Sequence, residues 1–121
     1  LLRKWFKKDR GFDLLTRAEK IELLYAVIYH WNHAARKYDT AWILRDADKL
    51  DGFGRDGMRR TRKVFKGDEQ GMNQDFRNQY SNYLQLETKC AIMLVKQHKL
   101  LEPLNSAYYR YLRSKIEPIK L

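Results

Sequence analysis

Six basic residues within a short segment have the clearest chemical meaning in this chain. Residues 55–66 read RDGMRRTRKVFK, with six lysines and arginines, one acid and three apolar residues. Arginine and lysine donate hydrogen bonds to phosphate oxygens, and such contacts need no particular base sequence. On a helix, four of the six share one face because they recur at spacings of three and four: Arg59, Arg62, Lys63 and Lys66. The pattern predicts a cationic helix that contacts a polyanion.

The distribution of charge supports this interpretation. The chain has 121 residues and a net charge of +10 at pH 7, and six bases against one acid in residues 52–66 supply half of it. Another basic cluster lies in residues 1–10. Charge gathered in a few segments favours an anionic partner. We therefore expect DNA or RNA to contact Arg55, Arg59, Arg60, Arg62, Lys63 and Lys66, helped by Arg3, Lys4, Lys7 and Lys8.

Other reactive side chains do not form a catalytic set. His30 and His33 stand three apart on a predicted helix and could face one metal, but a zinc site needs two further ligands. The acids of residues 46–51 are spaced partly like a calcium loop, yet a leucine and a glycine occupy positions where oxygen ligands are needed. We therefore expect no enzyme, no bound metal and no cofactor.

The single cysteine and the hydropathy pattern bear on the compartment. Cys90 has no intrachain disulfide partner, and its apolar surroundings predict a buried side chain. A chain without disulfides suits the cytoplasm. The longest apolar stretches, residues 23–29 and 91–95, are far shorter than the ~20 residues that span a bilayer. We expect a cytoplasmic protein without a membrane span.

Helical periodicity runs through the chain, and no segment alternates with the period of a strand. Thr16 and Glu19 form a capping box before apolar residues at heptad spacing, which predicts a helix over residues 17–38. Glycines predict loops at 51–57 and 67–71, and Pro103 predicts a helix stop. The expected helices cover residues 1–10, 17–38, 41–50 and 58–66, then 73 or 75 to about 101, and 105 or 106 to about 116.

These elements predict an all-α protein, a single bundle of five to six helices that forms one domain over residues 1–121. Met58 and Phe65 are expected to anchor the basic helix to the core. Near the C-terminus, three tyrosines interleave with Arg110 and Arg113, a mixture that stacks on bases or forms a protein interface.

The sequence is consistent with two functions. The first is a non-enzymatic nucleic-acid-binding protein with largely backbone-directed contacts. The alternative is a helical interaction or assembly factor. Its aromatic patches and the heptad seam from Ile21 to Tyr38 would meet a partner or a second copy, and its basic surface would then recognise an acidic protein.

Overall fold

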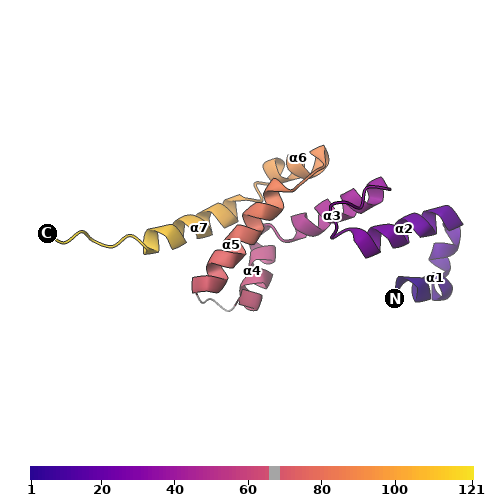
Figure 1. The fold of residues 1–121 in the computed structure, drawn as a ribbon, viewed down its shortest axis with the longest axis horizontal. Helices are drawn as coiled ribbons and strands as arrows, with labels where there is room; N and C mark the ends of the chain where they lie inside the picture. Colours follow the sequence, from indigo (N-terminus) through magenta and orange to yellow (C-terminus); the bar gives the residue numbers. More distant parts are fainter. Residues whose placement is uncertain (66–68) are drawn as a thin grey trace. The chain divides into compact units, whose positions relative to one another are not determined.

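The computed structural model describes residues 1–65 and 69–121, and every regular element in these residues is helical (Figure 1). The all-α class is confirmed. Seven α-helices are present in the described part, more than the five to six expected, because one predicted helix is divided. A short 3₁₀ helix, η1, follows the first of them. In chain order the elements are α1 (Leu2–Lys8), η1 (Arg10–Leu14), α2 (Arg17–Tyr29), α3 (Asp39–Asp51), α4 (Gly54–Phe65), α5 (Glu69–Leu84), α6 (Lys89–Gln97) and α7 (Glu102–Ser114).

The chain forms two compact units, which are described separately. Unit 1 is Leu1–Ala47 and unit 2 is Asp48–Leu121, so the boundary falls within α3. Unit 2 carries the basic helix α4.

The first helix of unit 1 and the start of the second match the prediction from the sequence. The helix expected over residues 1–10 is α1. Its Phe6 packs edge-on against Phe12 of η1, with ring centroids 5.1 Å apart. At the start of α2, the Thr16 hydroxyl accepts a hydrogen bond from the Glu19 backbone N–H. The Glu19 carboxylate in turn accepts one from the Thr16 N–H at 2.7 Å. The capping box is therefore confirmed.

The predicted extension of this helix to residue 38 is wrong, because α2 ends at Tyr29. Just beyond it, the Trp31 indole N–H donates to the carbonyl of Ile28 at 2.8 Å. The Asn32 side chain accepts from the N–H of Ala34 at 2.9 Å. Side chains that bond to nearby backbone in this way offer it an alternative to the helix. The heptad seam therefore stops after its first half.

A buried arginine holds the segment that follows α2. Arg45 is 2% exposed, and its guanidinium donates to the carbonyls of His30 at 2.7 Å, Asn32 at 2.6 Å and Ala35 at 3.3 Å. Carbonyls beyond the end of a helix lack intrahelical donors. Arg45 therefore stabilises the turns that replace the predicted helix.

Unit 2 opens with a tight connection where a long glycine loop was expected. Only Gly52 and Phe53 separate α3 from α4, and α4 begins at Gly54 with a positive φ of 80°. Within the first turn of α4, a Cβ on Gly57 would clash with the carbonyl of Gly52 and lie 2.8 Å from that of Asp51. The glycines therefore permit a close approach of backbone rather than a loop.

The long helix expected to reach residue 101 is in fact two helices. α5 ends at Leu84, and the Thr88 hydroxyl accepts from the Ala91 N–H to start α6. Between them Leu86 is buried, so packing bends the chain where no glycine or proline marks a break. The glycine break was placed wrongly at residues 69–71, which belong to α5, while residues 67–68 lie outside the described residues.

Pro103 begins a helix instead of ending one. It lies in the first turn of α7, where a missing N–H breaks no helical hydrogen bond. The turn before it is made by Lys99, whose φ is +50°. Neither Asn105 nor Ser106 caps this helix, since both lie inside it.

Two clusters of buried side chains hold unit 2 together. The first joins α6 to the α3–α4 connection, and the second joins α4, α5 and α7. Leu101 packs against both clusters, so they are continuous. The buried members are Phe53, Leu86, Ala91 and Val95 in the first cluster, and Met58, Phe76, Leu104 and Ala107 in the second.

The core tests two expectations about single residues. Met58 is buried, so its role as an anchor of the basic helix is confirmed. The side chain of Phe65 lies outside the described part of the structure. The expected burial of Cys90 is wrong: its thiol is exposed, because Ala91 and Val95, four residues apart, take the buried face of α6.

Candidate nucleic-acid interface

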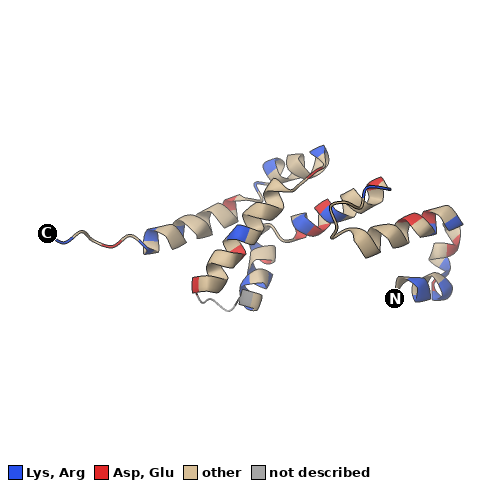
Figure 2. Ribbon diagram, in the orientation of Figure 1, with Lys and Arg blue, Asp and Glu red and all other residues tan. Residues whose placement is uncertain are grey.

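The predicted basic helix is present as α4. Figure 2 shows Lys and Arg recurring along it. Its buried residue Met58 faces the second cluster, and the basic side chains on the other faces of the helix are exposed. The local spacing therefore produces an amphipathic helix with one cationic surface.

This cationic surface forms one wall of a groove in unit 2. The other wall is the turn between α6 and α7 with α7 as far as Arg110, and the groove has a volume of about 950 Å³. His98 and Ser106 line it, and Met58 and Pro103 contribute apolar atoms. Among the residues that the structure describes, Glu102 is the only acid that lines it. Six lysines and arginines line it: Arg55, Arg59, Arg62 and Lys63 from α4, Lys99 from the turn and Arg110 from α7.

Two ion pairs at the groove are exposed and therefore weak. Arg59 lies 3.6 Å from Asp56, and Lys99 lies 3.9 Å from Glu102. All four side chains are more than half exposed. Exposed pairs of this kind stabilise a protein by at most about 1 kcal/mol. An incoming anion can therefore replace the carboxylate in either pair.

A second hollow, of about 600 Å³, lies on the other side of Arg62 and Arg110, which line both. It contains Asp75, which is 7% exposed and whose Oδ1 has no hydrogen-bond partner within the described residues. Burial raises the pKa of Asp75, whereas a hydrogen bond with Gln79 and the charge of Arg62 lower it. The charge of Arg62 thus acts on a buried carboxylate as well as on the groove.

The residues predicted to contact nucleic acid fall into four groups. Four of them line the groove together, as described. Arg60 does not line it, because its guanidinium donates to the carboxylate of Asp51 at 2.7 Å and to the Asp51 carbonyl at 2.6 Å. Lys66 lies outside the described residues. The other four lie exposed on α1, in unit 1: Arg3, Lys4, Lys7 and Lys8.

Sequence reasoning missed the second wall of the groove. The sequence placed Lys99 near the end of one continuous helix, whereas in the structure it lies in the turn after α6 and lines the groove. Arg110 had been noted for its aromatic neighbours only. A signal was available in Pro103, since proline is common in the first turn of a helix.

The metal-binding sets considered from the sequence do not assemble in the described part of the chain. No group of three His, Cys, Asp or Glu side chains in residues 1–65 and 69–121 lies close enough to hold a metal ion. Among the same residues, none of the helices has the length and hydropathy needed to cross a membrane.

Comparison with known proteins adds no relative. No protein-family model matches the chain, and no curated protein or solved structure is significantly similar to it.

Proposed function

We propose that this protein is a non-enzymatic nucleic-acid-binding protein whose groove in unit 2 contacts phosphates. The observation that carries the proposal is the convergence, within residues 1–65 and 69–121, of six lysines and arginines from α4, the α6–α7 turn and α7 on one hollow with a single acid. Like charges gathered in a concave surface reinforce one another and attract anions.

The dimensions of the groove favour a polymer. Arg55 and Lys63 are eight residues apart on α4, which corresponds to about 12 Å along the helix axis. A wall of this length can follow more than one phosphate of a strand, which a small anion cannot use. Arginine dominates the wall, and its planar fork suits phosphate oxygens.

Contacts to phosphate make binding strongly dependent on salt. Each neutralised phosphate contributes about −0.7 to −0.9 to the slope of log K against log salt concentration. Six contacts therefore predict a slope of about −4 to −5. Affinity should then fall about 300- to 2000-fold when salt rises from 50 to 200 mM.

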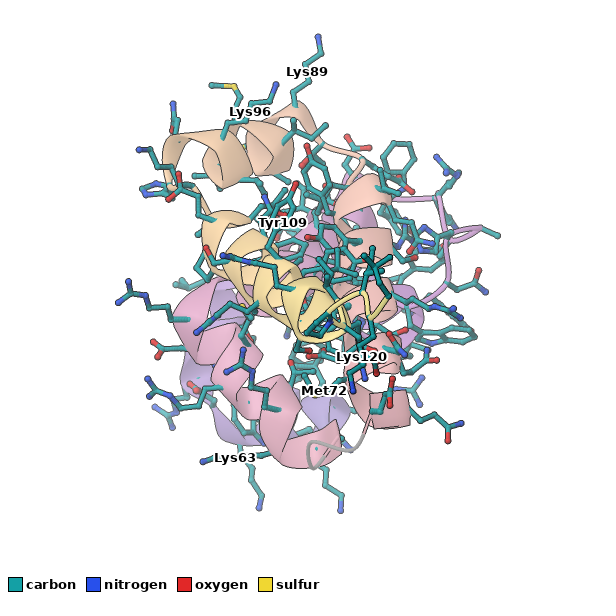
Figure 3. All side chains as sticks on the ribbon, turned by 90° about the vertical axis from the view of Figure 1, so that its left-hand side faces the viewer. Lys63, Met72, Lys89, Lys96, Tyr109 and Lys120 are labelled. Atoms are coloured by element: carbon teal, nitrogen blue, oxygen red, sulfur yellow. The ribbon has the colours of Figure 1, made fainter. Side chains whose placement is uncertain are left out.

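The experiment is a gel-shift titration at these two salt concentrations with the variant Arg59→Ala/Arg62→Ala/Lys63→Ala. With three contacts left, the fall between the two salt concentrations should shrink to about 20- to 40-fold. A matched control is Lys89→Ala/Lys96→Ala/Lys120→Ala, which removes the same charge outside the groove. Figure 3 shows Lys89 and Lys96 on α6, at the opposite side of the view from Lys63. The proposal fails if the protein binds no nucleic acid at low salt, or if both triple variants weaken binding equally.

The alternative of an assembly factor stays a prediction. An acidic protein would use the same arginines, and a second copy would use exposed apolar residues. Sedimentation of the purified protein tests self-association, and a monomer that shifts nucleic acid as described favours the groove.

A further inference from the structure

One aromatic ring on α7 stands apart from the other tyrosines of that helix. Tyr108 and Tyr111 both pack against Phe76, with ring centroids 5.0 and 5.4 Å away. Tyr109 is 62% exposed and belongs to neither buried cluster. An exposed tyrosine contributes little to the core, and so its ring is available to a ligand.

Tyr109 lies beside the basic groove. It lines a shallow hollow of about 380 Å³ whose other lining residues are Glu102, Asn105, Ser106, Arg110 and Arg113. Three of these, Glu102, Ser106 and Arg110, also line the groove. The two hollows are therefore neighbours on α7, and the basic side chains Arg110 and Arg113 line the smaller hollow together with the ring. In Figure 3, Tyr109 is on the α7 ribbon and Lys63 on the α4 ribbon.

Resting on the proposed function, we infer that the nucleic acid is single-stranded and that one of its bases stacks on Tyr109 while its backbone follows the groove. An aromatic ring beside a cationic groove is the combination that binds single strands, because every base has a π-face. In a duplex the bases are stacked on one another, so their faces are closed to Tyr109. Duplex DNA would then use the arginines alone.

The inference is tested with fluorescently labelled probes of equal length. The probes are twelve-nucleotide oligo(dT) and oligo(U), a twelve-base-pair duplex, and an abasic strand of the same twelve phosphates. Fluorescence anisotropy gives the affinity of each for the wild type, Tyr109→Ala and Tyr109→Phe. Thermal unfolding of each variant checks that the fold is retained; since the ring is exposed, we expect no change.

Tyr109→Ala removes the ring on which a base stacks. We therefore expect it to weaken binding to the preferred single strand about 5- to 100-fold. Tyr109→Phe keeps the ring and should bind within about twofold of the wild type. On the abasic strand all three proteins should bind alike, and the salt slope should be the same for Tyr109→Ala as for the wild type, because no phosphate contact is lost.

The outcomes separate this inference from the proposed function. If single strands bind and depend on the α4 arginines but are indifferent to Tyr109→Ala, the stacking inference is overturned and phosphate binding stands. Preference for the duplex, or equal binding of oligo(dT) and the abasic strand, overturns it as well. If none of the probes binds, the proposed function fails, and this inference fails with it.

Discussion

Arg45 provides a sharp test of how unit 1 is held together. Its guanidinium makes two short hydrogen bonds, to the carbonyls of His30 and Asn32, and one longer bond to that of Ala35. Hydrogen bonds that involve a charged group contribute about 1.5–3 kcal/mol each. The two short bonds therefore stabilise unit 1 by about 3–6 kcal/mol before the desolvation of the buried cation is counted.

The perturbation is Arg45→Met, which keeps most of the side-chain volume and removes every donor. Loss of the desolvation penalty offsets part of the lost bonding, so we expect the free energy of unfolding to fall by about 3 kcal/mol. With a urea dependence of about 1–3 kcal/mol per molar, the urea midpoint should fall by about 1–3 M. Arg45→Lys keeps the positive charge but loses the planar guanidinium group. Its free energy of unfolding should lie between those of the wild type and Arg45→Met.

Tryptophan fluorescence reports this unfolding selectively. The three tryptophans, Trp5, Trp31 and Trp42, all lie in unit 1. Arg17→Met serves as the matched control, because Arg17 is exposed and its loss should change stability by less than about 0.5 kcal/mol. If Arg45→Met unfolds at the same urea concentration as this control, the hydrogen bonds do not hold the turns and the reasoning is refuted.

Three further predictions concern unit 2. Gly57→Ala should lower the free energy of unfolding by about 1–3 kcal/mol in thermal melts followed by circular dichroism, because the new methyl meets the Gly52 carbonyl; an unchanged melt would contradict the tight connection. Burial raises the pKa of Asp75, so the folded protein binds the carboxyl proton more tightly than the unfolded chain does. The stability that this group contributes is therefore present at low pH and is lost as the pH rises between the unfolded and folded pKa values. Asp75→Asn should flatten urea stability across that interval, and an identical pH profile would count against it. Cys90 is exposed, so Ellman's reagent should label it fully in native buffer, whereas labelling that requires denaturant would show a buried thiol.

Local signals in the sequence predicted the local parts of this fold. The capping box of Thr16 and Glu19 and the amphipathic spacing of α4 depend on residues within a turn or two of each other, and both are present. The end of α2 was missed because it depends partly on Arg45, more than a dozen residues away in the chain from the end of that helix. The break after α5 was missed for the same kind of reason, since the burial of Leu86 is a tertiary effect.

In the candidate site, too, the part that depends on local spacing was predicted and the part that depends on tertiary packing was missed. The wall formed by α4 follows from spacing alone, because helical periodicity decides which side chains share a face. The wall that carries Lys99 and Arg110 depends on how α7 packs against α4, which no local pattern encodes. Arg60 shows the converse error: its position on a basic helix suggested a free cation, whereas Asp51 at the end of α3 binds it.

The packing of α4 on α7 has a consequence for the thermodynamics of binding. Met58 from α4 lies in one cluster with Leu104 and Ala107 from α7, so the two backbones that carry the groove are already ordered. Under the proposed function, association then needs no folding step. Beyond the loss of translational and rotational freedom, its entropic penalty comes from the long cationic side chains, at about 0.5–1.5 kcal/mol for each one immobilised. Flexible cations on a preorganised scaffold adjust to variable phosphate spacing. Under the proposed function, we expect such a surface to accept strands of different shapes rather than one rigid geometry.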